Sequence, residues 1–310
     1  MKMKRKWILW LLAFLILLPS AYLLYTYQSI KSTADQIYEE RKPSPVLPTF
    51  VQDRKTIQVG DNNKNINEAD PFTVLVLGVD QRPYDRGRSD VMILMAVNPQ
   101  KGSVLLFNIP RDTRTDIVGR GTVDKINHAY AFGGVEMSVS SVENFLQFPI
   151  DYYIKVDMEG FSSIVDSLGG VTVNNNMRFE YAGYNFDQGI LDLNGDEALA
   201  FSRMRFEDPK GDLGRNTRQR EVLKGILHKL LRVTTVFKLE SLLDNIGNSV
   251  RTDISFEEMK VFVTEYRQKL KNVEQVEIAG HGQKINGIWY YIVDEKERVD
   301  ITSTLRAYME

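Results

Sequence analysis

Arginine is concentrated in one short segment of this chain, the stretch FSRMRFEDPKGDLGRNTRQR at residues 201–220. Over the whole sequence the charge is nearly balanced, with 39 Lys and Arg against 41 Asp and Glu and a net charge of −2. Guanidinium groups are planar, permanently charged and able to bind phosphate oxygens two at a time. The segment therefore predicts a site for phosphate or pyrophosphate, provided that it lines a cleft.

The second half of this segment continues into residues 213–232, whose periodicity predicts a long amphipathic helix. Its apolar stripe, followed backwards in steps of three and four residues, reaches Gln219 and then Arg215. An arginine on the core-facing stripe, near the positive end of a helix, favours an anion site. The alternative is a structural salt bridge to a buried acid. Arg218 and Arg220 are expected on the helix surface or in a supporting role.

Three further charged residues of this segment lie before the helix: Arg203, Arg205 and Asp212. If the backbone between the two arginines is extended, both guanidinium groups point the same way and can join the phosphate site. Asp212 has two possible roles, and its spacing does not separate them. It could cap the helix or orient an arginine, or it could accept the proton of an attacking hydroxyl.

A second group of charged residues lies at the ends of predicted strands. Asp80 ends one apolar run, Asp90 directly precedes the next, and Arg111 follows the third, with Arg88 close to Asp90 in the sequence. The chain has no cysteine and only three histidines, which disfavours thiolate and imidazole metal sites. Two converging carboxylates favour Mg²⁺, which usually takes one or two carboxylates together with phosphate oxygens and water.

The order of the predicted elements indicates one α/β domain. Strands are expected at 72–80, 91–97, 103–109, 152–156, 171–173, 273–279 and 288–293, and helices at 125–133, 137–146, 159–168, 194–202, 213–232 and 255–271 and at the end of the chain. Alternating strands and helices are typical of an α/β domain with a central sheet. A hairpin between the second and third strands makes that sheet mixed.

The N-terminus carries a different signal. Residues 1–6 contain four basic side chains, and residues 7–30 contain no charged one. This pattern predicts a transmembrane signal-anchor at 7–28, with residues 1–6 in the cytoplasm and all later residues outside the cell (type II topology). A cleaved signal peptide is disfavoured because its apolar region is usually about 7–15 residues long. A buried helix is disfavoured because the run is apolar on every face.

After this span, residues 29–70 are polar and irregular and predict an extracellular stalk, and residues 71–310 form the predicted catalytic domain. Within 72–231 the sequence resembles the LytR–CpsA–Psr family. The segments that carry the resemblance are GVDQRPYDRGRSD, NIPRDT, DKINHAYAFGG, DYYIKVDMEGF, LNGDEALAFSRMR and GDLGRNTRQRE.

The resemblance implies a membrane-anchored phosphotransferase with an α/β/α fold around a mixed sheet. Such enzymes move an anionic glycopolymer, typically wall teichoic acid, from an undecaprenyl-pyrophosphate carrier in the membrane lipid to peptidoglycan, at the C6 hydroxyl of N-acetylmuramic acid. Asp80 and Asp90 match the Mg²⁺ carboxylates of the family. The pyrophosphate-binding positions match Arg88, Arg111, Lys125, Arg203, Arg205, Arg215 and Gln219, and the catalytic role falls on Asp212 together with Arg203 and Arg205.

Two other functions remain as alternatives. With water in place of the sugar hydroxyl, the same site would be a lipid-pyrophosphate hydrolase. A regulator of transcription is disfavoured because the net charge is −2, no basic face stands out, and the predicted topology places the domain outside the cell. The sequence therefore predicts no nucleic-acid partner.

Overall fold

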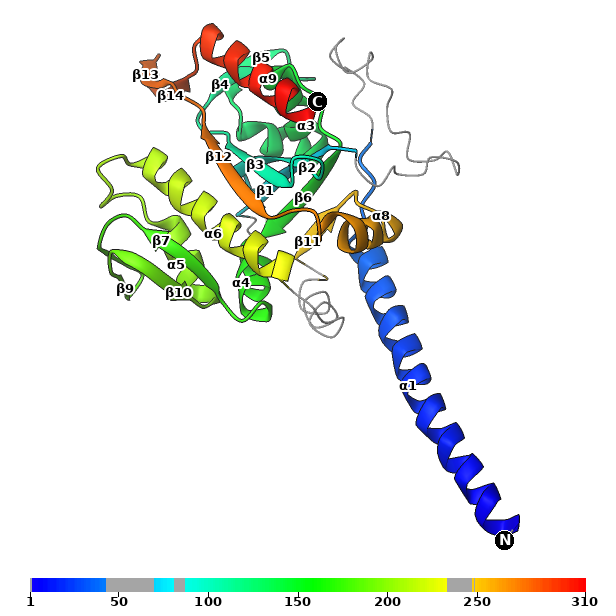
Figure 1. Ribbon diagram of the computed structural model, residues 1–310. Coiled ribbons are helices and arrows are strands. Elements are labelled where there is room, and N and C mark those ends of the chain that lie inside the picture. Colours follow the sequence, from blue (N-terminus) through cyan, green and yellow to red (C-terminus); the bar gives the residue numbers. More distant parts are fainter. Residues whose placement is uncertain (1, 43–69, 81–86, 233–246, 248) are drawn as a thin grey trace.

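The protein is described by a computed structural model that covers residues 2–42, 70–80, 87–232, 247 and 249–310 (Figure 1). Its centre is a six-stranded sheet with the strand order β11-β6-β1-β2-β3-β12. The strands are β1 (Phe72–Val79), β2 (Ser89–Asn98), β3 (Ser103–Asn108), β6 (Tyr152–Asp157), β11 (Val250–Thr252) and β12 (Asn272–Glu277). Two neighbouring pairs, β1–β6 and β3–β12, are parallel and the others antiparallel, which confirms the predicted mixed sheet.

Helices cover both faces of this sheet (Figure 1). Side chains of β1 alternate between the faces, so that Leu75 and Leu77 join one core and Val74 joins the other. The first core is closed by α3 (His128–Leu146) and α9 (Glu295–Met309). The second is closed by α6 (Asp212–Arg232), α8 (Phe256–Val261) and the π-helical turn η1 (Phe262–Tyr266). The predicted α/β/α layering is therefore confirmed.

A smaller lobe packs on the other side of α6 around its own apolar cluster. It consists of α4 (Met158–Ser167), β7 (Val171–Asn175), β8 (Phe179–Tyr181), β9 (Tyr184–Phe186), β10 (Gly189–Leu193) and α5 (Gly195–Arg203). Val222 and Ile226 of α6 belong to this cluster, whereas Leu223 and Leu227 pack on the sheet. Because α6 lies between two cores, its position is fixed from two sides, and so is that of the charged residues at its N-terminal end.

The helix predicted to start at Lys125 begins later. Lys125 ends a short hairpin formed by β4 (Arg114–Ile117) and β5 (Thr122–Lys125), and α3 starts at His128. The predicted break at Gly133-Gly134 is present as a kink, where Gly134 has a φ of 68° that favours glycine. Strands of three or four residues carry too little periodicity to be recognised in the sequence, which is why this hairpin was not predicted.

The N-terminal region forms one helix, α1 (Lys2–Ile37), which contains the predicted anchor at 7–28. Among the residues that the structure describes, no helix is both long and apolar enough to cross a membrane. The side chains of residues 2–9, 11–13 and 16 lie outside the described ones, so the anchor remains a prediction.

The beginning of the predicted stalk differs from an extended linker. The last turns of α1 dock on the domain, where Ile30, Ala34 and Ile37 are buried against β11 and α8. Tyr38 then forms a bridge to Thr252 of β11. The rest of the predicted stalk, residues 43–69, lies outside the described residues. The end of α1 that docks on the domain is short, and its polar and apolar residues form no long periodic pattern. The sequence of this segment therefore looks irregular, which is why a stalk was predicted there.

Directly after β11, Asp253 joins this docked segment to the sheet. Its carboxylate accepts a hydrogen bond of 2.7 Å from the Tyr153 backbone N–H and lies 3.7 Å from Arg41 Nε. Its side chain is only 10% exposed, and burial raises the pKa of Asp253 to about 6. Between roughly pH 4 and pH 6 the unfolded chain has therefore lost this proton while the folded protein keeps it.

We expect Asp253 to make folding less favourable as the pH rises through that window, because the folded state binds the extra proton. The loss from this one group is on the order of 2–3 kcal/mol, and it is complete above about pH 6. In Asp253→Asn, the free energy of unfolding measured with denaturant at several pH values should fall less over this window than in the wild type. Equal pH dependence in the two proteins would contradict the prediction.

Candidate active site

The carboxylate of Asp212, the first residue of α6, lies among three arginines. Its Oδ1 atom is 2.7 Å from Arg215 Nη2, 3.6 Å from Arg111 Nη2 and 3.6 Å from Arg205 Nε. One arginine comes from α6, one follows β3, and one belongs to the connection between α5 and α6. The fold thus brings together charged residues that are about a hundred positions apart in the sequence.

Arg111 connects this group to the end of the sheet. Its Nη1 donates a hydrogen bond of 2.8 Å to Asp90 Oδ1, and Asn127 Nδ2 donates to the same oxygen at 3.3 Å. Burial acts to lower the pKa of Arg111, but the carboxylates of Asp90 and Asp212 outweigh it and the pKa is raised. Asn127 was not among the predicted site residues, although it lies in the DKINHAYAFGG segment; only its position in space shows its role.

Several buried polar atoms of this cluster have no hydrogen-bond partner among the described residues. They are Arg111 Nε, Arg215 Nε and Nη2, Gln219 Oε1, Asn127 Oδ1 and Asp212 Oδ1. The 2.7 Å contact between Arg215 and Asp212 is thus an ion pair that lacks hydrogen-bond alignment. Leaving a buried donor unpaired costs about 1–3 kcal/mol, and such atoms are often completed by a ligand.

The charge of Arg215 is also poorly compensated. Burial lowers the pKa of Arg215, and the nearby positive charge of Arg111 lowers it further, against the opposing effect of Asp212. The residue is only 7% exposed, and Gln219, one helical turn later, is 8% exposed. Both therefore lie on the buried stripe of α6 as predicted. A bound anion would supply the negative charge and the acceptors that the cluster lacks.

The remaining predicted residues lie around this centre. Lys125 Nζ forms an ion pair of 2.8 Å with Asp112, which follows Arg111 in the chain. Arg203, the last residue of α5, and Arg88, just before β2, are both exposed. Within the described part of the chain, neither makes an ion pair or a hydrogen bond through its side chain, so both are free to contact a ligand.

Asp80 and Asp90 lie at the same end of the sheet. The register pairs Val79 with Ser89, which places one carboxylate directly after β1 and the other at the start of β2. The described residues contain no group of three or more acidic, histidine or cysteine side chains arranged to hold a metal. Two carboxylates suit Mg²⁺ only when phosphate oxygens and water complete its shell, and the adjacent arginines are suited to such phosphates.

The expectation that Arg218 and Arg220 lie on the helix surface was wrong; their supporting role is what the structure shows. Arg218 is 6% exposed and donates hydrogen bonds to Asp208 Oδ2 and to the Met204 carbonyl, both at 2.5 Å. Arg220 is 4% exposed and pairs with Glu277 of β12. A single apolar stripe cannot reveal a helix that is covered on two sides.

We expect Arg218→Ala to lower the free energy of unfolding by about 3–5 kcal/mol, because it leaves Asp208 buried without its partner. The measurement is denaturant unfolding, with Arg178→Ala as a matched control at a residue whose side chain is 71% exposed. Adding Asp208→Ala to Arg218→Ala should restore part of the loss. If Arg218→Ala were as stable as the control, the supporting role would be contradicted.

Comparison with known proteins places this chain in a family. Residues 24–307 match the LytR_cpsA_psr family, and the chain belongs to it. The polyisoprenyl-teichoic acid–peptidoglycan teichoic acid transferase TagU of Bacillus subtilis (strain 168) is 43% identical over 303 residues, which are 98% of this chain and 95% of that protein.

Solved structures agree with this assignment. The crystal structure of Bacillus subtilis TagU matches with a TM-score of 0.64 at 45% identity, covering 78% of this chain and 97% of that one. An Enterococcus faecalis structure, described as a transcriptional regulator, matches with a TM-score of 0.71 at 34% identity, covering 77% of this chain and 88% of that one. The predicted family resemblance is therefore confirmed.

Proposed function

We propose that the protein transfers an anionic cell-wall glycopolymer, most simply a wall teichoic acid, from an undecaprenyl-pyrophosphate carrier to the C6 hydroxyl of N-acetylmuramic acid in peptidoglycan. The observation that carries this proposal is the convergence of Arg111, Arg205 and Arg215 on Asp212, with buried donors that lack partners. A pyrophosphate supplies both the negative charge and the acceptor oxygens that such a cluster needs. The name of the Bacillus subtilis relative supports the choice of polymer and acceptor.

In this proposal the arginines hold the two phosphates of the donor. Arg111 and Arg215 bind from the buried side, and the more exposed Arg205, Arg203 and Arg88 approach from the solvent side. Phosphoryl transfer depends mainly on positioning and on stabilising the charge that develops on the leaving oxygens. The guanidinium groups of Arg111 and Arg215, held by Asp90 and Asp212, satisfy both requirements.

The chemical step exchanges one phosphorus–oxygen bond for another. The acceptor hydroxyl oxygen attacks the phosphorus that carries the polymer, the bond from that phosphorus to the bridging oxygen breaks, and undecaprenyl phosphate leaves. Asp212, which lies next to Arg111, Arg205 and Arg215, takes the hydroxyl proton. The products are a phosphodiester between polymer and muramic acid and the monophosphate of the carrier.

We include Mg²⁺ as the cofactor, held by Asp80 and Asp90. Bound there, it would neutralise part of the negative charge of the pyrophosphate. Asp90→Ala should shift the Mg²⁺ concentration that gives half-maximal transfer upward by about tenfold, because one of two carboxylate ligands is removed. A matched exposed variant, Asp196→Ala on α5, should not shift it. An unchanged requirement in Asp90→Ala would overturn the assignment.

The location follows from the substrates. A lipid-borne donor and a wall acceptor meet outside the membrane, so we propose that residues 7–28 anchor the chain and that residues 71–310 lie outside the cell. In intact cells, protease added from outside should cleave the domain. Protection of the domain would favour the regulator that the description of the Enterococcus faecalis relative suggests.

The transfer itself is tested with the full-length protein, a lipid-pyrophosphate-linked polymer and uncrosslinked peptidoglycan. A covalent polymer–glycan product that resists detergent extraction supports the proposal. Release of the polymer without such a product would identify a lipid-pyrophosphate hydrolase instead. Neither reaction would occur if the arginine cluster served only to stabilise the fold.

A further inference from the structure

A cavity of about 370 Å³ opens along the first turns of α6. Leu213, Asn216, Thr217 and Arg220 line it from the helix. Asn216 follows Asp212 by four residues and so lies on the same side of α6 one turn later. Pro110, which directly precedes Arg111, also lines it. Because Leu213 directly follows Asp212 in the chain, the cavity lies next to the start of α6, where the proposed catalytic carboxylate is located.

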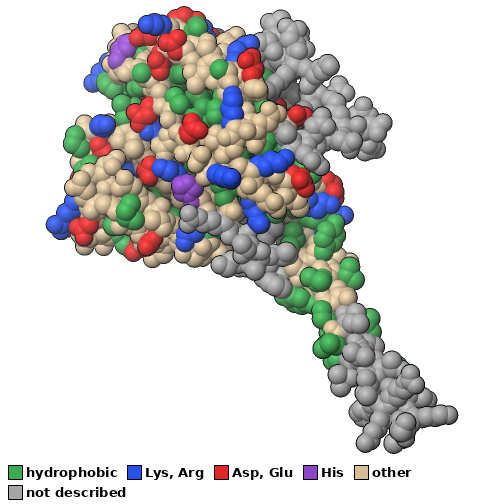
Figure 2. Space-filling view, in the orientation of Figure 1, with side chains coloured by type: hydrophobic (Ala, Val, Ile, Leu, Met, Phe, Trp, Pro, Cys, Tyr) green, Lys and Arg blue, Asp and Glu red, His purple; other side chains and the backbone are tan. Residues whose placement is uncertain are grey.

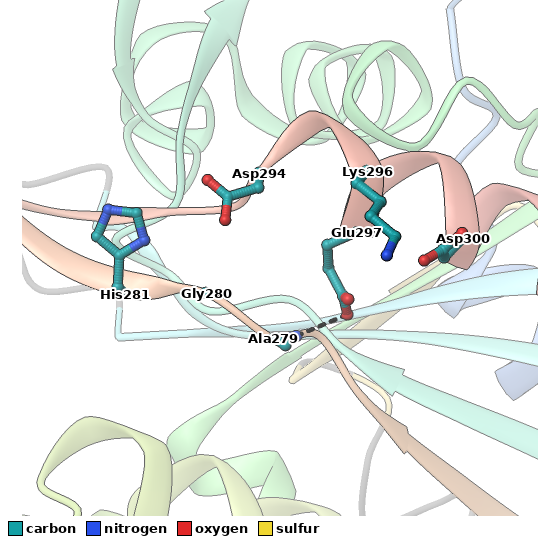
Figure 3. Close-up of a pocket in the computed structure, with 7 residues that line it drawn as sticks. All are labelled: Ala279, Gly280, His281, Asp294, Lys296, Glu297 and Asp300. Carbon is teal, nitrogen blue, oxygen red and sulfur yellow. Dashed lines mark hydrogen bonds between the residues drawn. The ribbon is translucent and has the colours of Figure 1, made fainter.

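A second cavity, of about 330 Å³, adjoins the first. Ala279 and Gly280 line both of them, so that the turn after β12 forms their common wall. The second cavity continues between His281 and the start of α9, where Asp294, Glu297 and Asp300 project (Figure 3). Glu297 also accepts a hydrogen bond of 2.8 Å from the Ala279 backbone N–H, which holds the two sides of this cavity together.

The first cavity contains a polar group that the protein itself does not complete. Arg220 lines it, is only 4% exposed, and has an Nε atom without a hydrogen-bond partner among the described residues. Its Nη2 atom is held by Thr217 and Glu277, so its orientation is fixed. Apolar side chains of Leu213 and Ile278 lie beside it. A few fixed polar groups among apolar ones are typical of a site that binds a sugar-sized ligand.

The second cavity differs in charge from the arginine cluster. The second cavity carries three acidic side chains against one lysine. In Figure 2 the upper edge of the molecule, where Figure 1 places α9 and β13 (His281–Ile285), shows acidic side chains together with some Lys and Arg side chains. A polyanionic donor would be repelled from this end and attracted to the arginines. The acidic second cavity thus disfavours the donor, whereas the first cavity carries Lys210 and Arg220 against Glu277.

We propose that these two cavities form one acceptor groove, which binds a glycan strand of peptidoglycan. The strand's sugar occupies the first cavity, with its hydroxyl next to Asp212. The free amino group of an uncrosslinked peptide stem lies among Asp294, Glu297 and Asp300 in the second. This inference rests on the proposed function, and it adds where the acceptor binds and which charge on the acceptor the protein recognises.

The test measures binding without any donor, so that it is independent of transfer. Fluorescently labelled, uncrosslinked glycan strands with peptide stems are titrated with the full-length protein in detergent. Ala279→Trp places a large ring at the common wall, where Ala279 is exposed and its replacement leaves the core intact. We expect its Kd for the strands to rise tenfold or more. The matched control is Ile190→Trp, at a residue of β10 in the smaller lobe that is 70% exposed.

A second variant tests the charge recognition. Asp300→Lys should raise the Kd about threefold or more, and Glu180→Lys, an exposed residue on β8, should leave it unchanged. Acetylating the amino groups of the strands should weaken binding to the wild type, with no further loss in Asp300→Lys.

Wild-type Kd values in both Ala279→Trp and Asp300→Lys would overturn the proposal. So would a loss of affinity of Ala279→Trp for the lipid-pyrophosphate polymer instead of the strands. A failure of transfer with strand binding intact would contradict only the proposed function.

Discussion

Replacing Arg215 with alanine should reduce polymer transfer by about 10³-fold, the effect expected when a fixed cation at a transferring phosphate is lost. Arg215 is 7% exposed, and its Nε and Nη2 atoms have no hydrogen-bond partner among the described residues. Its position at the start of α6 is held by packing on two sides, so it needs no rearrangement to meet the donor. The measurement is the initial rate of covalent polymer–peptidoglycan formation at saturating substrates.

The same substitution should not destabilise the fold. Burial and the charge of Arg111 already lower the pKa of Arg215, which means that its positive charge is disfavoured where it lies. We therefore expect the free energy of unfolding of Arg215→Ala to equal or exceed that of the wild type. This would separate Arg215 from Arg218, whose removal is expected to be costly. Residues placed for function rather than stability commonly show this pattern.

Two further variants test whether the lost transfer rate is specific to the guanidinium group of Arg215. Arg215→Lys keeps the charge but loses the planar pair of donors, and we expect it to recover only a small part of the rate. Arg178→Ala removes an exposed arginine from the smaller lobe and should transfer at the wild-type rate. Full activity of Arg215→Ala would show that the cluster does not bind the pyrophosphate.

The centre of the site could be predicted because it follows regular elements. Arg215 and Gln219 lie on a helical stripe that is visible in the sequence, and α6 forms over nearly the predicted residues. Asp90 and Arg111 flank the ends of long buried strands, whose neighbours in the sheet follow from the hairpin between them. Periodicity over many residues fixes such positions, and elementary geometry then brings their side chains together.

Positions that depend on a second layer of packing could not be predicted. Arg218 and Arg220 are buried because the small lobe and β12 cover the sides of α6, and neither contact has a periodic signal. Asn127 reaches Asp90 only because the β4–β5 hairpin turns the chain back toward the sheet. The docking of Ile37 on the domain likewise depends on the shape of β11 and α8. These are long-range contacts, and a local pattern carries little information about them.

Asp212→Asn should lower the maximal rate of transfer by about 10²–10⁴-fold, because an amide of the same shape cannot accept the hydroxyl proton. The carboxylate contacts Arg111, Arg205 and Arg215, so a second role, holding these arginines in place, has to be separated from the first. The two roles predict opposite changes in the KM for the lipid-pyrophosphate donor, so measuring this KM in the variant distinguishes them.

If Asp212 is the base, removing its negative charge leaves three guanidinium groups within 3.6 Å with less compensation, and the pyrophosphate should bind more tightly. We therefore expect the maximal rate and the donor KM to fall together, a combination that indicates lost chemistry rather than lost binding. If Asp212 only orients the arginines, the donor KM should rise, since an amide holds them less firmly. Asp196→Asn, an exposed change on α5, should alter neither quantity. A raised donor KM with a nearly unchanged maximal rate would remove Asp212 from the proton transfer and leave it as a positioning residue.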